Sequence, residues 1–169
     1  MKVNVKYSYF KENLCSFKSL FKKGEYNKDD KTIELDFEET EEFSALIKYT
    51  NNLEFICKIL GSNYVPYYVN AIDTLSSFHI FNEGQKKQAE KMLIDHFNEA
   101  PQILTISMLA SRIDYDTEDE REKTKDIAKA INREQKKDRK DRINKIMENR
   151  RIQQEKEFLR KHPRKYLVD

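Results

Sequence analysis

The chain opens with two short segments in which apolar and polar residues alternate. In residues 2–7 and 32–37 every second side chain is apolar, which is the pattern of a half-buried β-strand. Between them, residues 10–21 place apolar side chains three or four positions apart and predict a helix, which would end at Gly24 in the left-handed conformation. Residues 27–31 read as a polar turn. The sequence therefore predicts a small sheet of about two strands.

Helical periodicity dominates the middle of the chain. The acidic run at residues 38–42 suits the first turn of a helix that ends near Tyr49, because carboxylates favour helix N-termini. Residues 53–60 fit either a strand or a short helix, and we favour the helix. Residues 65–78 and 85–97 repeat apolar side chains every three or four positions and predict an αα-hairpin.

Two apolar stretches are candidates for binding a protein partner. The segment that Pro101 would open as a helix is apolar nearly all round, so it is either deeply buried or part of an interface. The tail, residues 163–169, joins a basic pair to apolar side chains and is either an anchor for a groove or a frayed end. The partner-binding candidates are Ile103, Leu104, Met108, Tyr166 and Leu167.

The segment from Thr117 to Lys161 contains neither Gly nor Pro and predicts one long helix. Thr117 followed by Glu120 forms a capping box. At about 1.5 Å per residue the helix would be roughly 65–70 Å long, which is too long to fold back over a small domain, so we expect it to project or to lie along a partner. The expected organisation is an α+β, mostly α domain at 1–115, the helix at 116–162, and the tail.

The chain as a whole has a net charge of only +2, but one section of this helix is strongly basic. Residues 133–151 hold nine basic and four acidic side chains, and 132–142 contain no apolar residue, which disfavours a coiled coil. Lysine and arginine can neutralise phosphates; the alternative is a solvated charged helix. The nucleic-acid-binding candidates are Arg133, Lys136, Lys137, Arg139, Lys140, Arg142, Lys145, Arg150, Arg151, Arg160, Lys161, Arg164 and Lys165.

The residues that usually carry catalysis are sparse. The three histidines do not pair at metal-ligand spacing, the three glycines are isolated, and the two cysteines, Cys15 and Cys57, lie among apolar residues. We therefore predict no enzyme, no metal or other cofactor, and no small-molecule substrate. No secretory signal or membrane span is evident, which predicts a cytoplasmic or nuclear protein.

Residues 1–100 resemble the BTB/POZ and elongin-C-like adaptor fold. The resemblance rests on the motifs at residues 17–21, 32–37, 43–49 and 70–80. The sequence departs from the family's usual order of elements because the hairpin of strands before the first helix is shortened to one strand. The resemblance implies a protein–protein adaptor without an active site, and the long helix lies outside it.

Together these features predict a non-catalytic binding subunit of a large assembly. Its globular domain would contact protein, and its basic helix would dock on RNA of a ribonucleoprotein, for example as a ribosome-associated factor. The alternative is a BTB-like adaptor that bridges protein partners without nucleic acid.

Overall fold

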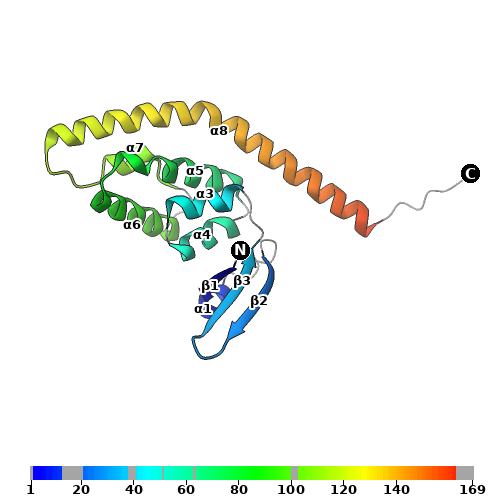
Figure 1. The fold of residues 1–169 in the computed structure, drawn as a ribbon. Coiled ribbons are helices and arrows are strands. Elements are labelled where there is room, and N and C mark those ends of the chain that lie inside the picture. The colour runs from blue at the N-terminus through cyan, green and yellow to red at the C-terminus, as the bar shows by residue number, and fades with distance from the viewer. Residues whose placement is uncertain are drawn as a thin grey trace, which may run out of the picture.

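The computed structural model of this protein describes residues 2–12, 21–37, 41–50, 52–62, 64–99 and 103–162. A small antiparallel sheet lies at one end of a group of helices, and one long C-terminal helix runs across them (Figure 1). The predicted class, α+β and mostly α, is confirmed.

The sheet has three strands, one more than predicted. Its order is β1 (Lys2–Lys6), β3 (Thr32–Phe37) and β2 (Phe21–Asn27), with both neighbouring pairs antiparallel. Along β1 and β3 every second residue is buried, so the alternation in the sequence marks the face that packs on the core. Val3 lies opposite Leu35, and both side chains are buried.

Gly24 does not end a helix, as the sequence suggested, because it lies inside β2 opposite Leu35. Among the described residues no glycine has a positive φ. A Cβ built at Gly24 would meet Ile33 Cδ1 at 3.1 Å and Leu35 Cδ2 at 3.3 Å. The missing side chain therefore leaves room for two core residues of β3. The predicted helix at 10–21 is described only as far as Glu12, and its remainder to Leu20 lies outside the described residues.

Most of the helices begin close to the residues at which the sequence predicts them. Residues 53–60 are helical, and the side chain of Asn52 caps that helix by accepting from the backbone N–H of Phe55 at 2.8 Å. The described helices are α1 (Tyr7–Glu12), α3 (Glu41–Tyr49), α4 (Leu53–Gly61), α5 (Val65–Ser76), the 3₁₀ turn η1 (Phe78–Ile80), α6 (Glu83–Glu99), α7 (Ile106–Ala110) and α8 (Glu118–Lys161).

The helix predicted to begin at Pro101 is shorter than expected. Among the described residues it starts at Ile106, and Ile103 and Leu104 precede it in chain without regular secondary structure. Both side chains are nevertheless buried in the core, and the carbonyl oxygen of Leu104 accepts from the buried hydroxyl of Thr74 at 3.1 Å. The structure therefore buries Ile103 and Leu104 in the core, whereas Met108 of the same segment is 42% exposed.

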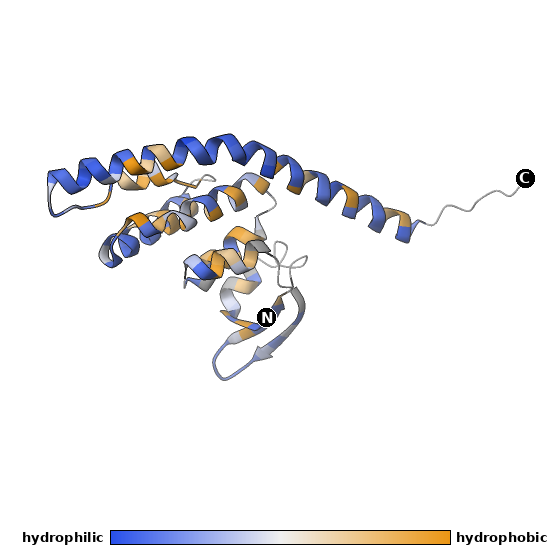
Figure 2. Cartoon of the chain, turned by 45° about the horizontal axis from the view of Figure 1, so that its top comes forward, coloured by the Kyte–Doolittle hydropathy of each residue, from blue (hydrophilic) through white to orange (hydrophobic). Residues whose placement is uncertain are grey.

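The prediction that the long helix projects is wrong for most of its length. α8 contacts α7, α5 and η1, and Figure 1 shows it running along the helices before its last part leaves them. Thr124 and Ala128 are buried, whereas every described residue from 151 to 162 is exposed. Figure 2 shows why the sequence concealed this contact: α8 is hydrophilic along most of its length.

Candidate nucleic-acid interface

α8 begins on a cap that also attaches it to α6. The hydroxyl of Thr117 accepts from the N–H of Glu120 at 3.2 Å, which is one of the two bonds of the predicted capping box. The carboxylate of Glu120 accepts from Gln85 Nε2 at 3.0 Å. Because Gln85 is buried at the start of α6, this bond fixes where α8 enters the domain.

The residues of α8 that contact the rest of the domain are three or four positions apart from Thr124 to Arg142. Near the start of α8 these side chains are small or apolar, and the last of them is Ile131, which packs on the core. From Gln135 onward the contacting side chains are polar and the first contact is a hydrogen bond. At about 1.5 Å per residue these contacts cover roughly 40 Å of the helix. The contacting residues are Thr124, Ala128, Ile131, Gln135, Arg139, Arg142 and Arg150.

Asp73 on α5 is the centre of the polar contact. Its side chain is only 4% exposed, and its carboxylate accepts from Arg139 Nε at 3.1 Å and from Arg142 Nη1. Two guanidinium groups thus compensate one buried negative charge. Arg139 and Arg142 were predicted to bind nucleic acid, and in the structure both bind Asp73, with the Arg139 side chain 18% exposed and that of Arg142 44% exposed.

Two further contacts extend this arrangement along α5. Gln135 Nε2 donates to the carbonyl oxygen of Asp73 at 2.9 Å and to Ser77 Oγ at 2.7 Å. At the other end, the guanidinium of Arg150 lies 5.1 Å from the centre of the Tyr68 ring, within the range of a cation–π contact. Polar contacts therefore hold the middle of α8 against α5 where the sequence offers no apolar residue.

The opposite face of α8 carries a stripe of cations. At about 100° per residue, Arg133, Lys136, Lys137, Lys140 and Arg151 fall within an arc of about 100° that faces away from Gln135. We call these five residues the basic stripe, and all five are exposed.

Acidic residues of the same section lie on a different flank. The helical repeat puts Glu134, Asp138, Asp141 and Glu148 between about 70° and 150° from the centre of the basic stripe, all on the same side of it. Within the part of the chain that the structure describes, the three lysines of the stripe and Arg133 form no ion pair. Arg151 pairs with Glu148 at 2.8 Å on the surface, a contact of little strength.

The other predicted residues are placed differently. Lys145 lies on the acidic flank, Arg160 is exposed near the end of α8, and Lys161 pairs with Glu157 at 2.7 Å. Met108 is 42% exposed, so it retains the exposure that a partner-binding role requires, whereas Ile103 and Leu104 do not. The tail residues Arg164, Lys165, Tyr166 and Leu167 lie outside the described residues.

Comparison with known proteins adds no family to this geometry. No protein-family model, curated protein or solved structure matches the chain. Among the described residues no helix combines the length and the apolar character needed to cross a membrane. The site must therefore be interpreted from its own residues.

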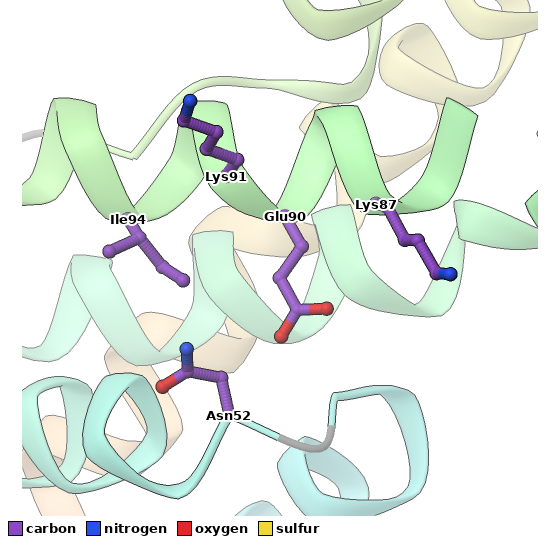
Figure 3. A pocket seen from close by; sticks show the side chains of 5 residues that line it. All are labelled: Asn52, Lys87, Glu90, Lys91 and Ile94. Carbon is purple, nitrogen blue, oxygen red and sulfur yellow. The ribbon is translucent and has the colours of Figure 1, made fainter. Parts of the chain in front are cut away.

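Among the described residues, a cleft beside α6 is a second place that could receive a ligand (Figure 3). It is lined by Asn52, Lys87, Glu90, Lys91 and Ile94. Two of its polar side chains already form hydrogen bonds within the fold, since Asn52 caps α4 and Glu90 accepts from the hydroxyl of Thr50. Figure 3 also shows the ammonium group of Lys91 turned away from Asn52. The cleft is therefore a weaker candidate than the basic stripe.

Cys57 and His79 do not form a nucleophile pair. Cys57 is fully buried in α4, while His79 is exposed in η1. His79 Nδ1 lies 3.1 Å from the carbonyl oxygen of Ser76. Burial raises the pKa of the Cys57 thiol to about 12, and the negative charge of Glu54 adds to the shift.

This burial predicts an unreactive thiol. In a Cys15→Ser variant, in which Cys57 is the remaining thiol, a disulfide reagent at about pH 8 should modify Cys57 only as fast as the protein opens, because the thiolate is the reactive form. The reaction with and without denaturant, followed by absorbance, measures this. Rapid, complete modification of the folded protein would contradict the burial.

Proposed function

We propose that this chain is a non-catalytic binding subunit that docks on RNA of a ribonucleoprotein through the basic stripe of α8. One observation carries the proposal. The helix turns two arginines inward to Asp73 and leaves Arg133, Lys136, Lys137 and Lys140 exposed and without an ion pair among the described residues.

The stripe has the chemistry for a phosphate backbone. From Arg133 to Arg151 it extends for about 27 Å along a continuous helix, and α5 holds that section through Asp73. Because the helix is already fixed, little conformational entropy is lost when the cations meet a polyanion. Such contacts neutralise phosphates without reading sequence and weaken as salt rises.

Removing the three lysines of the stripe tests the proposal. In the variant Lys136→Gln/Lys137→Gln/Lys140→Gln, the slope of log affinity against log salt concentration should fall by about two for single-stranded RNA. Fluorescence anisotropy with a labelled oligouridylate over a series of salt concentrations measures the slope. The exposed positions make a folding defect unexpected, and circular dichroism checks this.

A matched control removes the same charge elsewhere. Lys86, Lys123 and Lys129 each pair with a neighbouring carboxylate on the surface, so Lys86→Gln/Lys123→Gln/Lys129→Gln should preserve most of the salt dependence. Equal losses in both triple variants would show that only net charge matters. Binding that ignores salt in the wild-type chain would contradict phosphate docking.

The second candidate is a protein–protein adaptor without nucleic acid. It is favoured by the order of elements in residues 2–99, in which the small sheet, with the short helix α1 between β1 and β2, precedes helices α3 to α6, an arrangement compatible with the BTB/POZ resemblance. Purification of the full chain with its partners from its native cells, with and without nuclease, separates the two functions. A complex that survives both nuclease and high salt favours the adaptor.

A further inference from the structure

The exposed end of α8 carries an aromatic side chain that no contact with the domain explains. Phe158 is 60% exposed, and its ring stacks on that of His162 with 4.5 Å between the ring centres and 27° between the ring planes. The N–H of His162 donates to the carbonyl oxygen of Phe158 at 2.9 Å, and Nδ1 lies 3.2 Å from the same oxygen. The two rings are therefore held as a preformed pair.

This pair continues the line of the basic stripe. Phe158 and His162 follow Arg151 by seven and eleven residues, so they lie within about 20° of it around the helix. Phe158 lies about 10 Å farther along the axis. Figure 1 shows this end of α8 beyond the other elements, where a long ligand can reach it.

The neighbouring apolar residues point elsewhere. Ile152 and Leu159 are 39% and 43% exposed, but the helical repeat puts them about 120° and 100° from Phe158, on the side that carries the acidic residues. Phe158 lies in line with Arg151 and with the 56% exposed Met147, while Glu155 and Lys161 lie about 60° to either side. The basic stripe is therefore continued by exposed apolar and aromatic side chains, which suits a polyanion that also offers flat apolar bases.

We infer that Phe158 is a stacking platform for an unpaired base, so that the RNA docked on the basic stripe is single-stranded at this end of α8. This inference rests on the proposed function. Cations that follow the backbone, combined with an exposed aromatic ring, are the usual means of binding single strands. A base inside a duplex is covered by its neighbours and cannot stack on the ring.

The experiment compares two RNA probes with the full-length chain. One is an oligouridylate that carries a single 2-aminopurine, and the other is the same strand paired with an oligoadenylate that carries a uridine opposite the 2-aminopurine. Phe158→Ala should weaken binding of the single strand by about tenfold and reduce the quenching of 2-aminopurine. Phe158→Tyr should restore both, and duplex affinity should change by no more than about twofold.

Leu159→Ala is the matched control, since it removes an adjacent exposed side chain from the other flank. It should leave the affinity for the single strand unchanged. If Phe158→Ala behaves like the wild type while the lysine variant loses its salt dependence, the stacking platform is refuted and RNA docking stands. If the wild-type chain binds neither probe at low salt, the RNA proposal itself fails, and the platform fails with it.

Discussion

Replacing Leu104 by Ala should lower the free energy of unfolding by about 2–5 kcal/mol. Leu104 is 1% exposed and belongs to the core cluster, although it lies in a segment that the sequence also offered as a partner surface. Truncation removes a buried side chain and leaves a cavity that the surrounding helices fill only in part. Urea denaturation followed by circular dichroism measures the loss.

Met108 provides the control for this substitution. It lies four residues further along and is 42% exposed, so Met108→Ala should change the free energy of unfolding by no more than about 0.5 kcal/mol. Similar small effects at both positions would mean that Leu104 is not a core residue. A large loss at Leu104 alone separates burial from partner binding.

The regular parts of the fold were predictable because their signals are local. Alternation in residues 2–6 and 32–37 marks strands whose inner face is buried. The cap at Thr117 and the absence of Gly and Pro fix α8 to within a residue. Spacing alone does not decide the ion pairs of α8: Lys123 pairs with Asp119, four residues before it, whereas Arg142 pairs with Asp73 and not with Asp138.

Strand β2 escaped prediction because its signal is not local. Its sequence, FKKGEYN, lacks an apolar side chain at every second position. It becomes a strand by pairing with β3 from Thr32 to Phe37, with an irregularity near Lys23. Gly24, which suggested a helix end, instead accommodates Ile33 and Leu35. Only the tertiary partner decides between these two uses of a glycine.

The sequence was enough to predict which section of α8 is basic, but not which side of the helix each cation faces. Charge counting found the basic section of α8, yet it could not tell which cations face the domain, because Asp73 lies 66 and 69 residues before the arginines that bind it. One signal was available. Within residues 61–82 Asp73 is the only Asp, Glu, Lys or Arg, and an isolated charge in a buried helix needs a partner.

The pair of arginines gives the second large effect. The variant Arg139→Ala/Arg142→Ala should lower the free energy of unfolding by on the order of 3 kcal/mol, because it leaves the buried carboxylate of Asp73 without a cation. If α8 detached from residue 135 onward, water would reach the carboxylate of Asp73 and hydrate it. The free energy of unfolding can therefore fall by no more than the cost of that detachment. Urea denaturation measures the stability, and hydrogen exchange of residues 135–150 detects the detachment.

Removing the acid should cost less than removing the bases. In Asp73→Ala, water can hydrate Arg142, whose side chain is already 44% exposed, so we expect a loss of about 1 kcal/mol. Adding Asp73→Ala to the double arginine variant should then restore stability, since it removes the stranded charge. This reversal distinguishes a buried charge from a general loss of packing by the arginine stems.

Arg133→Ala/Arg151→Ala removes the same two charges from the basic stripe and is the control for net charge. Both side chains face solvent, so the free energy of unfolding should change by no more than about 1 kcal/mol in total. If this variant loses as much stability as Arg139→Ala/Arg142→Ala, Asp73 does not anchor α8. If it stays stable while RNA affinity falls, the inner face of the helix holds the fold and the outer face binds the ligand.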